Sequence, residues 1–198
     1  WKADGTNISG ATSSTYTLTN AEVGKAITVV ANYTDSRSTA ETVTSSATSA
    51  VTNTNDAGSI AISGTATQGQ TLTTNITDPD GVPASGITYQ WKADGTNISG
   101  ATSSTYTLTN AEVGKAITVV ANYTDNGSTA ETVTSSATAV VVNVNDAGSI
   151  AITGTATQGQ TLSTTITDPD GVPASGITYQ WKADGTNISG ATSSTYTL

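Results

Sequence analysis

The chain repeats itself with a period of 90 residues. Residues 1–18 recur letter for letter at residues 91–108 and again at 181–198. At this period residues 1–56 differ from their second copy at six positions, and residues 57–90 differ from theirs at three. Such a period is too long for helical solenoid units and close to the size of a sandwich domain that folds independently. The sequence therefore predicts an array of similar domains, not one large enzyme.

A polar linker sets the frame of the repeat. Residues 143–148 interrupt two β-prone runs, and residues 53–58 are their counterpart. We therefore expect residues 57–146 to form one complete domain. Residues 1–56 are then the C-terminal part of one repeat, and residues 147–198 the N-terminal part of the next. We expect the partial repeats to be completed by neighbouring molecules, head to tail, or by further repeats of a longer chain.

Composition narrows the classes of partner. The chain has 15 acidic and 6 basic residues, a net charge of −9, and no cluster of cations. Nucleic acid is therefore not an expected partner, because binding phosphates needs clustered positive charge. No apolar run approaches the roughly 20 residues that cross a bilayer, so direct membrane insertion is not expected. Without cysteine, stability must come from the core, from ions or from neighbouring domains.

Hydrophobic periodicity predicts an all-β fold. Apolar residues alternate with polar ones, as in half-buried strands, and no stretch shows a helical period. The last strand is expected from about Thr129 to Val142, with Val133, Ala137, Ala139 and Val141 on one face. The other strands are expected around residues 60–62, 72–76, 87–91, 106–108 and 117–123. Six or seven short, mostly antiparallel strands in 90 residues predict a two-sheet sandwich of immunoglobulin type.

Two dipeptides predict tight hairpins. Asp94-Gly95 and Asn126-Gly127 both suit a two-residue turn whose central positions need positive φ. Other glycines separate the remaining strands at the spacing that a sandwich requires.

The motifs of the complete repeat resemble an immunoglobulin-like domain. The segments are Tyr89-Gln90-Trp91-Lys92-Ala93-Asp94-Gly95, Ile98-Ser99-Gly100-Ala101, Ser104-Thr105-Tyr106-Thr107-Leu108 and Asn110-Ala111-Glu112-Val113-Gly114. They resemble the third strand, the hairpin after it, the fifth strand and the bottom corner of that fold. Trp91 would be the buried core tryptophan, and the cysteine pair of antibody domains is absent.

The whole repeat is similar to the immunoglobulin-like tandem repeats of giant bacterial surface adhesins, including those secreted by type I systems. Asn145-Asp146-Ala147 at the joint and Asp78-Pro79-Asp80-Gly81 after the second strand extend the resemblance. It implies a secreted protein at the bacterial cell surface. Such repeats would act as structural extenders that project a ligand-binding region for adhesion or biofilm formation.

Catalysis is not expected. The chain has neither cysteine nor histidine, so it cannot form a Ser-His or Cys-His pair. Paired carboxylates remain, but an active site copied in every unit of a near-identical array would be unusual.

Acidic and amide side chains predict a calcium site. Asp78 and Asp80 flank a proline in one tight loop, where their charges repel unless a cation lies between them, and hard oxygen ligands suit calcium. The joint resembles the calcium-binding linkers of cadherin-like repeats. The alternative is that the loop is only a turn and the joint only a linker. The candidate ligands are Asp78, Asp80, Asn143, Asn145 and Asp146, with their copies Asp168, Asp170, Asn55 and Asp56.

The leading functional hypothesis is a spacer, in which neighbouring repeats of the same chain are the direct partners. One alternative is a module that binds glycan or protein weakly and gains through avidity. That hypothesis needs an exposed aromatic or apolar patch, whereas the alternation around Trp91 and Tyr106 favours burial in the core. A third hypothesis is an accessory segment of a secreted enzyme.

Overall fold

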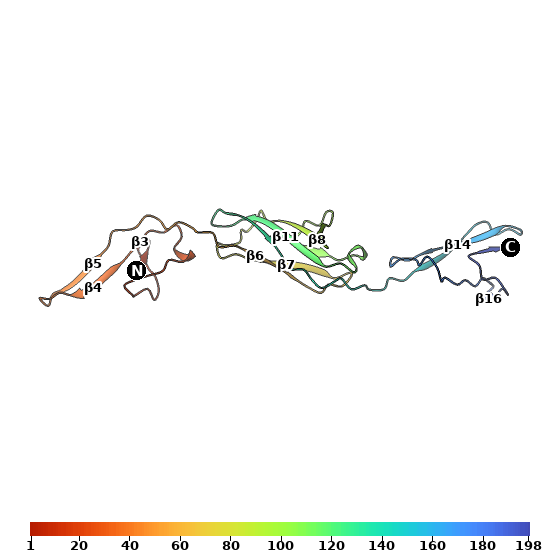
Figure 1. Cartoon of the computed structure of the whole chain (residues 1–198), viewed down its shortest axis with the longest axis horizontal. Helices are drawn as coiled ribbons and strands as arrows, with labels where there is room; N and C mark the ends of the chain where they lie inside the picture. The colour runs from red at the N-terminus through yellow and green to blue at the C-terminus, as the bar shows by residue number, and fades with distance from the viewer. The chain divides into compact units, whose positions relative to one another are not determined.

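The computed structural model describes residues 1–198 and is all-β, with several antiparallel sheets (Figure 1). The helical segments are two 3₁₀ turns of three residues, η1 (Asn20–Glu22) and η2 (Asn110–Glu112). Neither has the length and apolar character that crossing a membrane requires. The all-β prediction is thus confirmed.

The strands recur with the sequence period. Residues 1–56 carry β1 (Lys2–Ala3), β2 (Thr6–Asn7), β3 (Ile27–Thr28), β4 (Val30–Thr34) and β5 (Ala40–Thr44). Residues 57–146 carry β6 (Ser59–Ser63), β7 (Thr71–Thr77), β8 (Thr88–Ala93), β9 (Thr96–Asn97), β10 (Thr105–Thr107), β11 (Ile117–Thr124) and β12 (Ala130–Thr134). Residues 147–198 carry β13 (Ser149–Thr153), β14 (Thr161–Thr167), β15 (Lys182–Ala183), β16 (Thr186–Asn187) and β17 (Thr195–Thr197).

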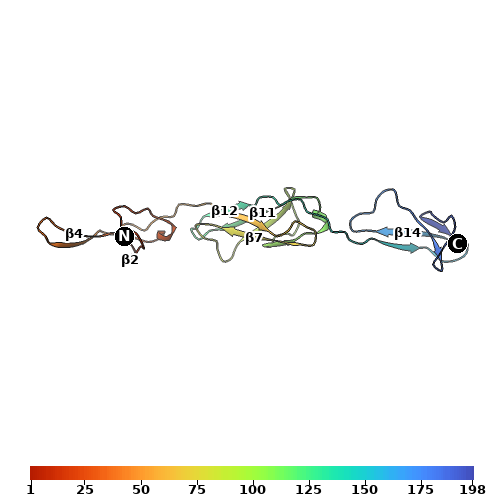
Figure 2. The same ribbon diagram turned by 90° about the horizontal axis from the view of Figure 1, so that it is seen from below.

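The middle stretch forms two sheets, as a β-sandwich requires. One sheet has the order β10-β7-β6 and the other β12-β11-β8-β9. Figure 2 shows β11 beside β12, where Tyr123 lies opposite Glu131 in the antiparallel register. Side chains alternate between buried and exposed along β11, which is the pattern that its sequence predicts.

The chain divides into two compact units. The first comprises residues 1–63, 73–106 and 118–137, and the second comprises residues 64–72, 107–117 and 138–198. The division crosses β7, β10 and β11 and does not follow the sequence period. The repeat boundaries at residues 57 and 147 therefore stay predictions.

Each unit has a buried apolar core. In the first unit Trp91, Val119 and Ala121 are fully buried, and in the second Leu72 and Ile117 are. Trp91 is 0 % exposed, its Nε1–H donates to the Ser103 carbonyl oxygen at 2.8 Å, and its ring lies 6.0 Å from that of Tyr106. The prediction that Trp91 is a core residue is confirmed. Because Trp91 is buried, neither face of its ring is free for a sugar to stack on.

The single long strand expected from Thr129 to Val142 is wrong. β12 ends at Thr134, and pairing resumes only as isolated bridges at Val140, Val141 and Val142. The hydroxyl oxygens of Ser135 and Thr138 accept the N–H groups of Val119 and Ile117, each at 3.0 Å. From Ser135 to Thr138 this segment advances three residues, while β11 advances two between Val119 and Ile117. The segment therefore contains a β-bulge. Because the bulge shifts the alternation, Ala137 and Ala139 are exposed, although Val133 and Val141 are buried as expected.

One of the two predicted hairpin turns is confirmed and the other is wrong. Asp94 and Gly95 have φ of 45° and 79°, as a two-residue turn needs. Between β11 and β12, however, the positive φ lies at Ser128 and not at Asn126-Gly127. The Asp125 carboxylate accepts the Thr129 N–H at 2.7 Å and closes a three-residue loop. The first copy forms the same turn with Ser36-Arg37, so this turn does not depend on Asn-Gly.

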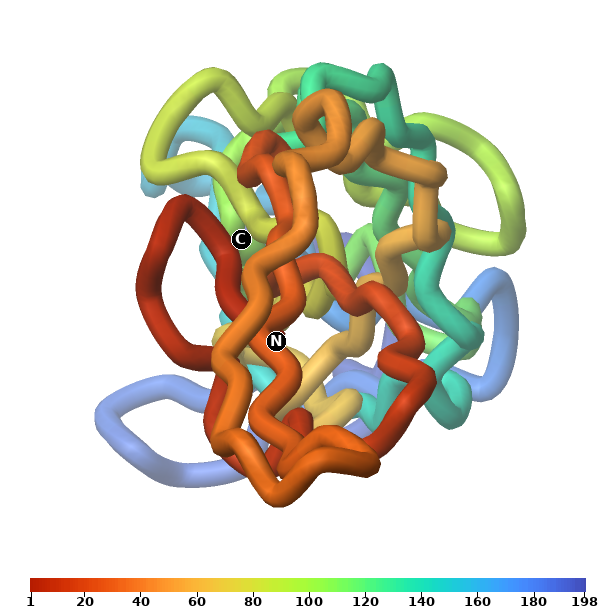
Figure 3. The backbone as a smooth tube through the Cα atoms, turned by 90° about the vertical axis from the view of Figure 1, so that its left-hand side faces the viewer, coloured from red at the N-terminus to blue at the C-terminus, as the bar shows by residue number.

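Side chains that are buried in the middle stretch are open in the partial copies. Tyr33 on β4 is 51 % exposed whereas its counterpart Tyr123 is 5 % exposed, and Ile150 on β13 is 60 % exposed whereas Ile60 is 7 % exposed. β4 and β5 still pair in the same register as β11 and β12, and their adjacent orange backbones can be followed in Figure 3.

Candidate metal centre

The Asp78–Gly81 loop follows β7, and hydrogen bonds to its first aspartate close the turn. The Asp78 Oδ1 atom accepts the Asp80 N–H at 2.8 Å, and the Asp78 carbonyl oxygen accepts the Gly81 N–H at 3.0 Å. Aspartate commonly closes such turns, with glycine at the position of positive φ, here 97° at Gly81. The turn brings both carboxylates to the same end of the strand.

Asp125 reaches this loop from the end of β11. It is 5 % exposed; its Oδ1 caps the β11–β12 turn, and its Oδ2 is buried with no hydrogen-bond partner. Next to it, the Asn126 N–H donates to the Gly81 carbonyl oxygen at 3.1 Å, which ties the two loops together. As a result Asp78, Asp80 and Asp125 each offer a carboxylate oxygen, all within 4.8 Å of one another.

Tyr123 and Glu131 border the three aspartates. The Tyr123 hydroxyl donates to the Asp78 Oδ2 atom at 2.7 Å. Burial raises the pKa of Tyr123 above its usual value, and the hydrogen bond to Asp78 and the charges of Asp78, Glu131 and Asp125 raise it further. Tyr123 therefore remains a proton donor. Glu131, opposite Tyr123 on β12, is also buried.

The linker before β6 packs against the same cluster. The Asp56 N–H donates to the Asp80 Oδ2 atom at 2.6 Å, and the Asn55 side-chain amide donates to the Glu131 Oε1 atom at 2.8 Å. Asn20 of η1 donates to the Asp80 Oδ1 atom at 2.9 Å. All these contacts lie within the first compact unit, and they connect the end of one sequence copy to loops of the next.

Close approach explains two glycines here. A Cβ atom on Gly58 would overlap the Tyr123 hydroxyl, and one on Gly127 would overlap the Asn53 side chain. A side chain at either position would therefore force these neighbouring side chains to move.

This oxygen-rich cluster can hold a metal ion. The ligand atoms on offer are three carboxylate oxygens, which suit hard cations. The partnerless Asp125 oxygen is the best indication, because a buried, unpaired charge is costly unless a cation or hydrogen bond compensates it. The turn reading of Asp78-Pro79-Asp80-Gly81 also holds, since one loop provides both the turn and the carboxylates.

The candidate ligands named from sequence fall into two groups. Asp78, Asp80, Asn55 and Asp56 meet at this cluster. Asp146, Asp168 and Asp170 meet in the second unit, where the Asp146 N–H donates to the Asp170 Oδ2 atom at 2.8 Å and the Asp170 N–H to the Asp168 Oδ1 atom at 2.9 Å. Asn143 and Asn145 are exposed in the linker beside them.

The second group repeats the first only in part. Its Asp146 carboxylate accepts the Gln68 side-chain amide at 2.7 Å, and the Asn110 amide contacts the Pro169 carbonyl oxygen. No counterpart of Asp125 or Glu131 joins it, because in the other copy of that segment Asp35 follows β4 and Glu41 lies on β5, both in the first unit.

Sequence reasoning missed Asp125, Glu131, Tyr123 and Asn20. A signal for Asp125 was present, since an aspartate directly before a predicted hairpin lies at the end of a strand. Asp78 and Asp125 follow strands of different sheets, so their meeting depends on how the two sheets face each other, which the sequence pattern does not fix.

Comparison of the sequence with models of known protein families, with curated proteins and with solved structures finds no match.

Proposed function

We propose that the chain consists of structural spacer repeats from a large bacterial surface adhesin, built as immunoglobulin-like sandwiches and stiffened by calcium at their joints. The repeats would lie outside the cell and project a ligand-binding region for adhesion or biofilm formation. The role is mechanical and not catalytic. The near-identical repeat, the two-sheet arrangement and the resemblance of the motifs support this proposal.

The main support for calcium binding is the Asp125 carboxylate. Its Oδ2 atom is buried without a partner and belongs to a cluster with Asp78 and Asp80. Calcium accepts six to eight oxygen ligands in flexible geometry, so it tolerates a site built from two loops and a linker. Extracellular modules of this kind bind calcium with a Kd of about 10⁻⁴ to 10⁻³ M.

Contacts at the joint support the stiffening role. Asn20, Asn55 and Asp56 come from one sequence copy, and they contact Asp80 and Glu131 of the next. A cation among these carboxylates would remove their mutual repulsion and hold the linker against the loops. Calcium would then couple neighbouring repeats without adding any residue to the linker.

The test is small-angle scattering and thermal melting of the 198-residue chain, first with calcium and then with excess chelator. We expect calcium to raise Tm and lengthen the maximum dimension, because the joint bends less. Asp125→Asn serves as the variant that should lose this response. If calcium changes neither quantity, the metal part is wrong; if the isolated repeats bind cells or glycans by themselves, the spacer part is wrong.

A further inference from the structure

The turn between β11 and β12 does not need the Asn126-Gly127 pair that it carries. Its positive φ lies at Ser128, and the first copy closes the same turn with Ser36-Arg37. Asn126 is nevertheless the one asparagine of the chain that precedes a glycine. That pair is chemically distinct, because glycine has no side chain to keep its backbone nitrogen away from the preceding amide.

The two groups of this pair that can react with each other are free of hydrogen bonds. Asn126 is exposed, and neither its side-chain amide nor the Gly127 N–H has a hydrogen-bond partner. In the first copy the corresponding Arg37 N–H donates to the Asp35 Oδ1 atom at 2.8 Å. The backbone nitrogen is therefore held in the first copy and available in the second.

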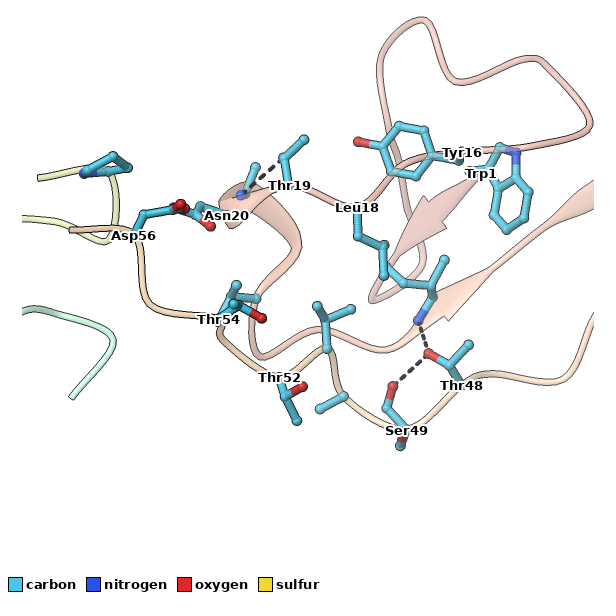
Figure 4. Close-up of a pocket in the computed structure, with 16 residues that line it drawn as sticks. Trp1, Tyr16, Leu18, Thr19, Asn20, Thr48, Ser49, Thr52, Thr54 and Asp56 are labelled. Carbon is cyan, nitrogen blue, oxygen red and sulfur yellow. Dashed lines mark hydrogen bonds between the residues drawn. The ribbon is translucent and has the colours of Figure 1, made fainter. Parts of the chain in front are cut away.

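Two other asparagines at the joint are held in place. The Asn20 side-chain amide donates to the Asp56 Oδ2 atom at 3.3 Å, and Figure 4 shows Asn20 beside Asp56. The Asn55 side-chain amide donates to the Glu131 Oε1 atom at 2.8 Å. Both precede residues that have a side chain. Of these three asparagines, only Asn126 combines a free amide with an unshielded backbone nitrogen.

We propose that Asn126-Gly127 is a site of spontaneous deamidation in the folded chain. The Gly127 nitrogen attacks the Asn126 Cγ atom and forms a new C–N bond. The bond from Cγ to the side-chain nitrogen breaks, and ammonia leaves with the proton that the Gly127 nitrogen gives up. Water then opens the cyclic imide at either of its carbonyl groups, which yields aspartate or isoaspartate at position 126.

Both products change the joint. The Asn126 N–H donates to the Gly81 carbonyl oxygen at 3.1 Å, and a Cβ atom on Gly81 would overlap the Asn126 side chain, so this side chain lies against the Asp78–Gly81 loop. Aspartate at position 126 adds a negative charge beside a cluster of three carboxylates. Isoaspartate lengthens the main chain within the turn, which displaces the Thr129 N–H from the Asp125 Oδ1 atom that accepts it.

The reaction requires neither calcium nor a mechanical role. It depends on one dipeptide and its turn, so the proposal can fail while the proposed function stands, and the reverse.

The test is mass spectrometry of the folded 198-residue chain after incubation in chelator at neutral and at mildly alkaline pH, with fragmentation to assign each modified residue. We expect Asn126 to deamidate about tenfold or more faster than any other asparagine, because only Asn126 precedes glycine. The rate should rise with pH, since the attacking nitrogen must lose its proton. Both aspartate and isoaspartate should form, because the cyclic imide opens in two ways.

Asn126→Ser is the matched control, because serine stands at the corresponding position of the first copy, where the same turn forms. This variant should lose the fast reaction. Hydrogen exchange at Thr129 should accelerate as the wild-type chain ages and stay constant in the variant. A chain unfolded in urea shows what the dipeptide does without the turn. If Asn126 reacts in urea but no faster than other asparagines in the folded chain, the turn protects it and the proposal is wrong.

Discussion

At the scale of single residues, Asp125 has two roles that can be separated. Its Oδ1 atom closes the β11–β12 turn, and its Oδ2 atom is buried among carboxylates with no donor. Asp125→Asn keeps an oxygen for the Thr129 N–H and removes the charge. We expect the variant to be up to about 1 kcal/mol more stable than wild type in chelator, because one repulsive charge is gone, and to lose most of the stabilisation by calcium. Urea unfolding with and without calcium measures both effects.

Asp35→Asn is the control for this experiment. Asp35 closes the same turn in the first copy, where its Oδ1 atom accepts the Thr39 N–H at 2.8 Å, but it lies outside the aspartate cluster. The calcium response of this variant should match wild type. Equal losses in the two variants would assign the effect to the turn and not to a metal.

Tyr123 makes the stability of the fold depend on pH in the alkaline range. Burial first, and then the hydrogen bond to Asp78 and the nearby carboxylates, raise its pKa above the ordinary value of 10.0. A group whose pKa is raised on folding contributes stability that is complete below its unfolded pKa and is lost as pH rises toward the folded one. Unfolding free energy should therefore fall above about pH 10. Tyr123→Phe should flatten this decline and cost about 1.5 kcal/mol at pH 7, by leaving the Asp78 Oδ2 atom without its donor.

The matched change for that measurement is Tyr33→Phe. Tyr33 is the counterpart of Tyr123 in the first copy and is half exposed. Tyr33→Phe should alter neither the pH dependence of the unfolding free energy nor its value at pH 7. A profile for Tyr123→Phe identical to wild type above pH 10 would contradict the raised pKa.

At the scale of elements, the bulge after β12 redirects the chain. The Ser135 hydroxyl accepts the buried Val119 N–H, and beyond it the chain bridges to Ala116, Val113 and Thr67 in place of continuing the β11 ladder. Ser135→Ala would leave that N–H without an acceptor, so we expect a loss of about 1 to 3 kcal/mol in urea unfolding. Ser136→Ala, at an exposed position, should be neutral. A neutral Ser135→Ala would mean that the bulge forms without the hydroxyl.

The sequence predicts an element well when local interactions form it, and poorly when contacts between distant segments form it. β6, β7 and β11 were predictable because alternation is local and strong, and so was the Asp94-Gly95 turn. The bulge was not, because it depends on two hydroxyls that replace ladder partners on another strand. Two of the three clustered carboxylates, Asp78 and Asp80, were predictable from the Asp78-Pro79-Asp80-Gly81 loop. Asp125 was not, because β7 and β11 belong to different sheets and their ends meet only where the two sheets come together.

At the scale of the whole molecule, the copies differ at a position that faces a joint. A Cβ atom at Gly127 would overlap the end of the Asn53 side chain, which would have to move, and the counterpart of Gly127 in the first copy is Arg37. An array that carries both residues has two kinds of joint. We therefore expect sequence differences between copies to tune the joints one at a time, while the cores of the repeats stay the same.

Gly127→Arg tests this idea directly. The new side chain would push Asn53 away, loosen the Asn55–Glu131 hydrogen bond and place a positive charge near the carboxylates that a cation would neutralise. We expect calcium affinity to fall about tenfold, which corresponds to about 1.4 kcal/mol, and hydrogen exchange at residues 53–58 to accelerate. Arg37→Gly, the reverse change in the first copy, should alter neither quantity, because Arg37 belongs to the turn that Asp35 closes, and Asp35 is not part of the aspartate cluster. If Gly127→Arg leaves both calcium affinity and exchange unchanged, the close approach at Asn53 does not control the joint, and the difference between the copies has no mechanical role there.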